Sequence, residues 1–349
     1  MIRLFYFLFL CFPLMAEDLT NLELIRAEYT EYLDTDRAVI LKASTLKAEA
    51  EKEALDFLLK GLTLHDSAMP LSSLEENVTY ALKARQEFPW AKALPKALFF
   101  NDVLPHAQLD ETRDRWRKGF YQRFAKMVQS CSTAKEAVYR INHAIKDEVK
   151  VIYSTKRKKP NQSVSESMEQ GVASCTGLSI LLANAFRSVG IPARIAGVPS
   201  WTKVRGNHNW VEVYIDGEWK FTEYYPDKEL NKSWFLTRVA DADLSKWYYK
   251  VYASSYEKRQ QHFPMVWNIE DQSVPGVDVS VRYIELAKKA GLKKVLAKDE
   301  LELRIVFKKE GKRQAQWIRL YQGEKKLAEG ETRSAEKDAN DFLVFVVKR

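Results

Sequence analysis

Cysteine and histidine are scarce in this sequence. Its 349 residues include three cysteines and five histidines. Two of the cysteines and four of the histidines stand at no spacing typical of metal ligands: Cys131, Cys175, His65, His106, His143 and His262. The sequence therefore predicts no metal site, and we expect no cofactor.

A dominant charge of one sign is also lacking. The formal net charge is +8, and the lysines and arginines are spread along the chain rather than massed, which does not indicate a nucleic-acid partner. Hydrophobic residues make up 46% of the chain, a content that excludes wholesale disorder. The chain is too long for one ordinary core, so we expect two or three domains.

A run long enough to span a membrane is missing as well. Residues 4–15 are largely apolar and follow a short charged start at Arg3, but they are too few to cross a bilayer comfortably. With Ala16 and the acidic Glu17 after them, they resemble a secretory signal peptide cleaved after Ala16. We therefore expect export to the periplasm or the extracellular space, with an uncleaved N-terminal membrane anchor as the alternative.

Glycine and proline are almost absent from residues 23–33 and 38–62. Residues 23–33 and 38–62 are rich in Ala, Leu, Glu and Lys, which favours helices. Three stretches have the Ser/Thr-x-x-Glu pattern of a helix N-terminus and begin at Ser72, Thr133 and Ser163. The N-terminal helical region is therefore expected to be a scaffold that carries no catalytic residues.

The stretch 174–177 (Ser-Cys-Thr-Gly) opens the most informative part of the chain. Apolar residues then recur at helical spacing, namely Leu178, Leu181, Leu182, Ala185, Phe186 and Val189. Gly190 and Pro192 end this helix. Cys175 lies at its start, where the positive end of the helix dipole and the free N–H groups favour a thiolate. Cys175 is therefore the candidate nucleophile.

A hairpin follows that supplies a base and an acid. Residues 208–215 alternate in polarity, and Asp216-Gly217 is a strong two-residue turn signal. This turn places Glu223 diagonally across from His208, about 7–8 Å away and within reach of a long side chain. A carboxylate there orients the imidazole and stabilises its charged form. The sequence thus predicts a catalytic arrangement of Cys175, His208 and Glu223.

Together these pieces resemble the transglutaminase-like, papain-related superfamily. The matching residues are Gly171 to Cys175, Leu181, Gly190 to Arg194, His208 to Val213, Gly217, Trp219 and Glu223. The resemblance implies an α+β fold with a papain-like core, a Cys nucleophile, a His base and an acidic third residue. The family's usual third residue is Asp, whereas this chain has Glu223; Asp227 is the alternative acid.

The two remaining cysteines are expected to be free thiols. A disulfide between Cys131 and Cys175 would immobilise the proposed nucleophile, although a lone disulfide is the alternative in an oxidising compartment. Taken alone, Cys175 would be a buried structural cysteine. Its combination with His208 and Glu223 favours catalysis over the other hypothesis, a catalytically silent binding module.

Other features near the predicted site leave alternatives open. Gln170 is a weak candidate for the oxyanion donor, and the N–H of Cys175 is preferred. The basic loop 156–162 is either a solvated loop or a positive rim of the site. Trp201 is a wall of the cleft or part of the core. The aromatic stretch 230–267 favours a domain interface over a sugar- or peptide-binding surface.

The C-terminal part changes character. From Val277 the chain has short alternating segments with turn signals at Gly311, Gly323 and Gly330, which indicates a small β-sandwich-like domain. The predicted organisation is a signal peptide (1–16), a helical N-terminal region (17–135), a transglutaminase-like core (136–275) and a β-rich domain (276–349).

The predicted function is that of an exported thiol enzyme. It acts on amide bonds of peptides or proteins through a thioester, with hydrolysis favoured over cross-linking. The sequence does not choose between protease, deamidase and transglutaminase. The expected partners are protein or peptide substrates, cell-wall peptides among them; no nucleic acid and no stable membrane span after processing are expected.

Overall fold

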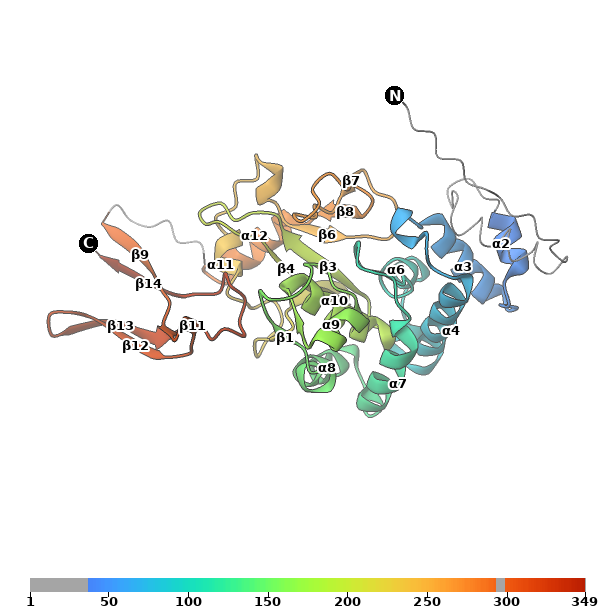
Figure 1. The fold of residues 1–349 in the computed structure, drawn as a ribbon, viewed down its shortest axis with the longest axis horizontal. Helices are drawn as coiled ribbons and strands as arrows, with labels where there is room; N and C mark the ends of the chain where they lie inside the picture. The colour runs from blue at the N-terminus through green and yellow to red at the C-terminus, as the bar shows by residue number, and fades with distance from the viewer. Residues whose placement is uncertain (1–36, 293–298, 349) are drawn as a thin grey trace, which may run out of the picture.

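The computed structural model describes residues 37–292 and 299–348. Figure 1 shows an elongated molecule in which helices lie at the N-terminal end, a mixed core lies in the middle, and paired strands project at the C-terminal end. The predicted signal peptide and the predicted helix at 23–33 lie outside the described residues. Within those residues, none of the helices has the length and apolar character to cross a membrane.

The N-terminal part of the described chain is helical. Its elements are α2 (Arg37–Ala43), α3 (Glu49–Lys60), the 3-10 turn η1 (Leu64–Asp66), α4 (Leu71–Glu87), α5 (Pro89–Lys92), α6 (Lys96–Asp102) and α7 (Trp116–Val128). Helices α2, α3, α4 and α6 enclose an apolar cluster that includes Leu55, Val78 and Phe99. The single helix predicted over 38–62 is broken, because Ser44 leaves the helix and donates a 2.8 Å hydrogen bond to Glu75.

Two of the three predicted helix starts are confirmed. Thr133 accepts the N–H of Glu136 at 3.2 Å and begins α8 (Ala134–Val149). Ser163 likewise accepts the N–H of Glu166 and begins α9 (Val164–Gln170). The prediction at Ser72 is wrong: α4 starts one residue earlier, after the extended Pro70, and the Ser72 hydroxyl accepts a hydrogen bond from Arg115 instead.

Helix α10 (Cys175–Ser188) lies at the centre of the core, between the sheet and helices α7 and α8 (Figure 1). Every residue from Thr176 to Ser188 is buried, so the helix is covered on all sides rather than along one apolar stripe. Its polar side chains have internal partners. Asn184 accepts a 2.8 Å hydrogen bond from Gln108, and Arg187 donates to the carbonyl of Ala193 at 2.8 Å.

The core sheet has six strands in the order β5-β4-β3-β6-β8-β7. These are β3 (Ala193–Val198), β4 (His208–Ile215), β5 (Glu218–Thr222), β6 (Tyr252–Ser254), β7 (Gln261–His262) and β8 (Pro275–Asp278). The short strands β1 (Ile152–Tyr153) and β2 (Val172–Ala173) pair separately and in parallel. The predicted hairpin is confirmed: Ile215 pairs with Glu218 and Val211 pairs with Thr222.

The chain after β6 differs from the prediction. Strand β8 pairs with β6 inside the core sheet, so the boundary predicted at 276 falls within the core. The alternating segment expected to begin at Val277 ends with β8 at Asp278, and helix α12 (Ser280–Lys289) follows. Ser280, Tyr283 and Ala287 are its buried residues, and this spacing is helical rather than alternating. Tyr283 packs in the apolar cluster around Trp210.

The aromatic stretch 230–267 mostly belongs to the interior. It contains α11 (Leu236–Val239) and the 3-10 turn η2 (Trp247–Tyr249). Phe235 and Phe263 are buried, and Phe235 stacks on Trp210 with ring centroids 4.1 Å apart. Trp247 is 48% exposed and is an exception. These contacts lie inside the core itself, so the expectation of a domain interface stays a prediction.

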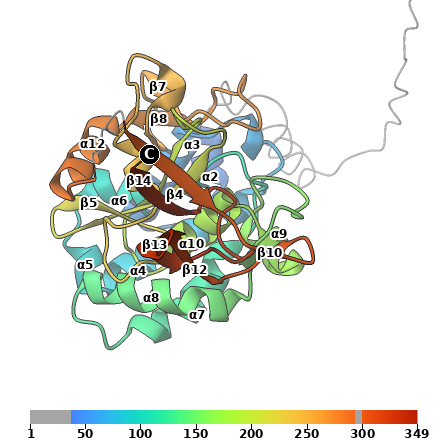
Figure 2. The ribbon, with the colours of Figure 1, turned by 90° about the vertical axis from the view of Figure 1, so that its left-hand side faces the viewer.

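The C-terminal region is rich in strands, which pair two by two. Its strands are β9 (Glu300–Ile305), β10 (Lys308–Lys309), β11 (Lys312–Arg313), β12 (Trp317–Gln322), β13 (Lys325–Glu331) and β14 (Leu343–Lys348). The pairs are β9 with β14, β10 with β11, and β12 with β13. Figure 2, viewed from the C-terminal end, shows these strands in front of the core. Residues 332–342 join β13 to β14, and we call this segment the C-terminal strap.

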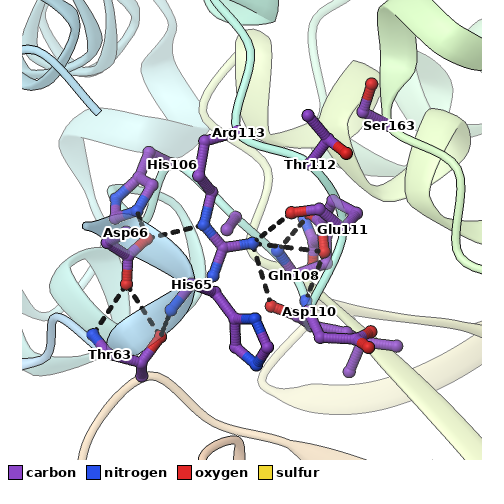
Figure 3. Close-up of polar contacts among 12 residues, drawn as sticks. Thr63, His65, Asp66, His106, Gln108, Asp110, Glu111, Thr112, Arg113 and Ser163 are labelled. Carbon is purple, nitrogen blue, oxygen red and sulfur yellow. Dashed lines mark hydrogen bonds and ion pairs between the residues drawn. The ribbon is translucent and has the colours of Figure 1, made fainter. Parts of the chain in front are cut away.

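A buried ionic cluster fastens η1 to the loop before α7 (Figure 3). One oxygen of Asp66 lies 2.7 Å from Nε2 of His106 and 2.6 Å from Nε of Arg113. Its other oxygen accepts the N–H of Thr63 at 2.7 Å. Glu111 on the same loop accepts two further N–H groups of the chain, at 2.7 Å each. The cluster therefore holds the loop that leads into α7, against which α10 packs.

We expect Asp66→Asn to lower the free energy of unfolding by about 3 kcal/mol, because the variant removes the buried carboxylate that pairs with Arg113 and contacts His106. Urea denaturation would measure the change. Asp56→Asn is the control: Asp56 pairs with Lys60 and Arg37 at the surface, so its loss should cost less than about 1 kcal/mol.

The difference in unfolding free energy between wild type and Asp66→Asn should depend on pH. Burial alone would raise the pKa of Asp66, but the charges of Arg113 and His106 and their hydrogen bonds lower it far below its usual range. A lowered pKa stabilises the fold above the unfolded-state value of about 3.9. The gap between wild type and Asp66→Asn should therefore narrow as the pH falls below about 4. A pH-independent gap would contradict the charged role of Asp66.

Candidate active site

Cys175 is the first residue of α10, as the sequence predicted. The hydroxyl of Ser174 accepts the N–H of Gly177 at 3.1 Å and donates to the carbonyl of Pro160. This cap fixes where the helix begins, and it leaves the free N–H groups of the first turn beside the thiol. Cys175 and Cys131 are both free thiols, in agreement with the prediction. Cys175 is partly exposed, whereas Cys131 is buried.

His208 is the first residue of β4, and its imidazole is buried, with 4% of the side chain exposed. The rings of Trp234 and Phe235 lie beside it, with centroids 4.9 Å and 5.5 Å from that of His208. Nε2 of His208 lies 2.6 Å from Oε1 of Glu223. Glu223 directly follows β5, so the hairpin register brings the two side chains together. Ser233 donates a hydrogen bond to the other oxygen of Glu223.

The alternative acid, Asp227, lies apart from the imidazole. Its carboxylate accepts the N–H of Lys228 at 2.7 Å and lies 3.7 Å from Lys232. The geometry therefore places Glu223, not Asp227, against His208. Gln170 accepts the N–H of Lys158 at 3.1 Å and does not line the cavity at Cys175. Trp201 is buried in the core and does not line that cavity either.

The sequence reasoning missed a second carboxylate at the site, Asp338. Oδ2 of Asp338 lies 3.3 Å from Nδ1 of His208, on the opposite side of the ring from Glu223. Asp338 is 8% exposed. It belongs to the C-terminal strap, which is far away in sequence, and no local pattern in the chain signals its position.

The strap is held over the core by several hydrogen bonds. Asn340 donates to the carbonyl of Asn207 at 3.0 Å, directly before β4. The N–H of Ala339 donates to the Tyr153 hydroxyl at 3.2 Å, and Arg238 donates to the carbonyl of Asn340. These contacts fix Asp338 beside the imidazole.

A small cavity of about 60 Å³ lies over Cys175. Its lining combines the core with the strap, and includes Tyr153, Cys175, His208, Glu223, Trp234, Lys337, Asp338 and Asp341. This volume accommodates a few water molecules but not a peptide side chain together with its backbone. A large substrate would therefore need the strap to move.

The two carboxylates control the charge of His208. Burial alone would lower the pKa of His208, but the negative charge of Asp338 and the contacts with Asp338, Cys175 and Glu223 raise it well above its usual range. Burial would likewise raise the pKa of Asp338, but His208 and the hydrogen bonds from Asn340 lower it. We therefore describe His208 as an imidazolium at neutral pH.

Two other residues of the sequence motif have structural roles. Arg194 and Glu212 face each other on β3 and β4, and Arg194 Nε lies 2.8 Å from Glu212 Oε2. Glu212 is fully buried and also accepts the Tyr283 hydroxyl at 2.7 Å. This ion pair ties the strand that carries His208 to its neighbour and to α12.

Comparison with known proteins agrees with the resemblance seen in the sequence. Residues 122–223 match the family model described as the Transglutaminase-like superfamily. The chain therefore carries a transglutaminase-like core, and this match spans Cys175, His208 and Glu223 but not Asp338. A search of the curated proteins found no match.

Two solved structures are similar over part of the chain. A candidate cysteine protease from Cytophaga hutchinsonii aligns with a TM-score of 0.32 and 17% identity, over 40% of this chain and 45% of that one. A structure described as a TGase aligns with a TM-score of 0.27 and 17% identity, over 34% of each chain. This chain thus covers less than half of either structure. Similarities at these TM-scores say nothing about its activity.

We expect Asp338→Asn to lower the pKa of His208, because the variant removes an opposite charge in direct contact with the ring. NMR titration of histidine-labelled protein would follow the imidazole resonances. Glu336→Gln, in the same strap, is the control, because Glu336 pairs only with the exposed Lys146 among its charged contacts. An unchanged titration of His208 in Asp338→Asn would contradict the ion pair.

The same substitution should alter how stability depends on pH. A raised pKa means that His208 stabilises the fold fully below its unfolded value of about 6.5. This contribution is lost as the pH rises through the higher folded-state value. In Asp338→Asn the loss should be smaller and should end at a lower pH, and thermal unfolding across the neutral and alkaline range would detect it.

Proposed function

We propose that this protein is a cysteine-dependent enzyme that acts on amide bonds of peptides or proteins. The observation that carries the proposal is the contact of 2.6 Å between His208 Nε2 and Glu223 Oε1, beside a free thiol at a helix start. One ligand atom each of Cys175, His208 and Asp338 lies within 4.8 Å of the others, so the thiol and the imidazole are close enough for proton transfer after small adjustments. The transglutaminase-like core supports this class of chemistry.

In the first step the thiolate of Cys175 attacks the carbonyl carbon of a substrate amide. The imidazolium of His208 gives its Nδ1 proton to the leaving nitrogen as the C–N bond breaks, and a thioester remains. Glu223 holds the ring through Nε2 and stabilises its positive charge. The N–H of Cys175, at the start of α10, is suited to stabilise the oxyanion.

In the second step a nucleophile resolves the thioester. Neutral His208 accepts a proton from water, the hydroxide adds to the carbonyl, and the C–S bond breaks to restore the thiolate. Water at a backbone amide gives proteolysis, water at a side-chain amide gives deamidation, and an amine gives cross-linking. We favour hydrolysis of peptides, including cell-wall peptides, because the proposed export brings the protein to them. Cell fractionation and N-terminal sequencing of the mature protein would test export.

A catalytically silent binding module is the second candidate. The observation in its favour is the C-terminal strap, which places Asp338 against the catalytic imidazole and leaves little room over Cys175. The enzyme hypothesis requires this strap to open for substrate.

We expect activity on a pool of casein and peptidoglycan peptides that falls by at least about 1,000-fold in Cys175→Ala, because an acyl-enzyme needs the sulfur. The assay should include a labelled primary amine. New amino termini identify a protease, released ammonia without cleavage identifies a deamidase, and incorporated amine identifies a transglutaminase.

Cys131→Ala is the matched control, because it removes the other thiol and should leave the rate unchanged. The assay should be repeated with Asp338→Ala, which removes the strap carboxylate from His208. If both wild type and Asp338→Ala are inert while the protein still binds peptides, the silent module replaces the enzyme.

We expect Glu223→Gln to keep the fold and reduce kcat by about 100-fold or more, because an amide cannot stabilise the imidazolium as a carboxylate does. Asp227→Asn should change kcat little, since Asp227 makes no contact with His208. Circular dichroism would verify folding of both variants. The reverse order of effects would assign the third catalytic position to Asp227.

A further inference from the structure

Cys175, His208 and Asp338 have the composition of a metal site. One possible ligand atom from each lies within 4.8 Å of the other two, and the cluster combines a thiol, an imidazole and a carboxylate. His208 and Asp338 are buried, and Cys175 faces the cavity. Among the residues that the structure describes, this is the group whose spacing could hold an ion.

Two atoms of the cluster lack ordinary hydrogen-bond partners. Nδ1 of His208 and Oδ2 of Asp338 are both buried, and within the described part of the chain neither makes a hydrogen bond of normal geometry. They face each other at 3.3 Å as an ion pair. Buried polar atoms normally have such partners, and atoms without them call for a reason such as a catalytic role, a water or an ion.

The spacing of these two atoms fits a tetrahedral cation. Zinc binds imidazole nitrogen and carboxylate oxygen at about 2.0–2.2 Å, so two such ligands on a tetrahedral ion lie roughly 3.3 Å apart. The observed separation between His208 Nδ1 and Asp338 Oδ2 is 3.3 Å. A thiolate with an imidazole favours zinc, whereas calcium and magnesium prefer oxygen ligands alone.

The surroundings of the cluster resemble the outer shell of a zinc site. A histidine that binds zinc usually donates its other ring N–H to a carboxylate. Here His208 Nε2 lies 2.6 Å from Glu223. The second oxygen of Asp338 accepts the N–H and the Nδ2 of Asn340, at 2.8 Å and 3.0 Å. Glu223 and Asn340 thus orient His208 and Asp338 so that Nδ1 of the ring and Oδ2 of the carboxylate face each other.

We propose that Cys175, His208 and Asp338 bind one Zn²⁺ ion, with a water from the adjoining cavity as fourth ligand. The ion occupies the thiolate and the nitrogen that the proposed reaction uses, and it tethers the C-terminal strap to the core. Bound zinc therefore inhibits the enzyme and holds the strap closed over the site. This regulation rests on the proposed function, but zinc binding itself does not.

Equilibrium dialysis of the full-length protein against ZnCl₂ would test the site. Wild type should bind one zinc per chain, and Cys175→Ala, His208→Ala and Asp338→Ala should each lose that zinc. Glu223→Gln should weaken binding about 10–100-fold through the outer shell. Cys131→Ala and Glu336→Gln are matched controls and should bind as wild type does. Undiminished binding in Asp338→Ala or Cys175→Ala would overturn the proposal.

Two further measurements on wild type guard against variants that misfold. Co²⁺ in place of zinc should give the near-ultraviolet charge-transfer band of a cobalt–thiolate bond, and prior alkylation of the protein should abolish it. Zinc should also slow alkylation of Cys175 by iodoacetamide at least tenfold in wild type and not in Asp338→Ala. A cobalt spectrum without a thiolate band, or alkylation that zinc does not slow, would overturn the site.

These outcomes separate the two proposals. A protein that binds zinc as described but cleaves no amide bond would contradict the proposed function and keep the zinc site. An active enzyme whose Cys175 binds no zinc would contradict the zinc site and keep the proposed function.

Discussion

A buried imidazole between two carboxylates is the interaction on which this site depends. Glu223 contacts Nε2 of His208 at 2.6 Å, and Asp338 lies 3.3 Å from Nδ1. An uncompensated charge at this depth would be costly, so the ring needs its anionic neighbours. The hairpin β4–β5 supplies the first carboxylate, and the C-terminal strap supplies the second. The core and the C-terminal region therefore each contribute one carboxylate to the same imidazole.

The two carboxylates act differently on the proposed chemistry. Glu223 lies on the far side of the ring from Cys175, where it supports the charged form without blocking substrate. Asp338 faces Nδ1, the nitrogen that gives up its proton in the proposed reaction. The carboxylate of Asp338 therefore competes with the thiolate for that proton. Under the proposed function, a substrate would have to replace the strap as the partner of this face of the ring, and the cost of that exchange would reduce its affinity.

The local parts of this site could be predicted from the sequence. A helix start fixes Cys175, and a two-residue turn fixes the register that sets Glu223 against His208, because both follow from short-range geometry. Asp338 could not be found in this way, since its position depends on how a distant loop returns over the core. Helix α12 was missed because its buried residues are few, and Tyr283 reads equally well in a strand. Because α10 contains polar residues, its sequence predicted one apolar stripe, whereas the helix is buried on all sides.

The strap has a further property that follows from its connections. It lies between β13 and β14, and β14 is paired along its length with β9, so the strap has no free end. It can leave the cleft only as a bulging loop whose two ends stay in place. Its return is therefore intramolecular, with an effective concentration on the order of millimolar. A separate peptide carrying the same residues would have to reach that concentration to compete, whereas after a single cut in the strap Asp338 would still be tethered through the uncut side.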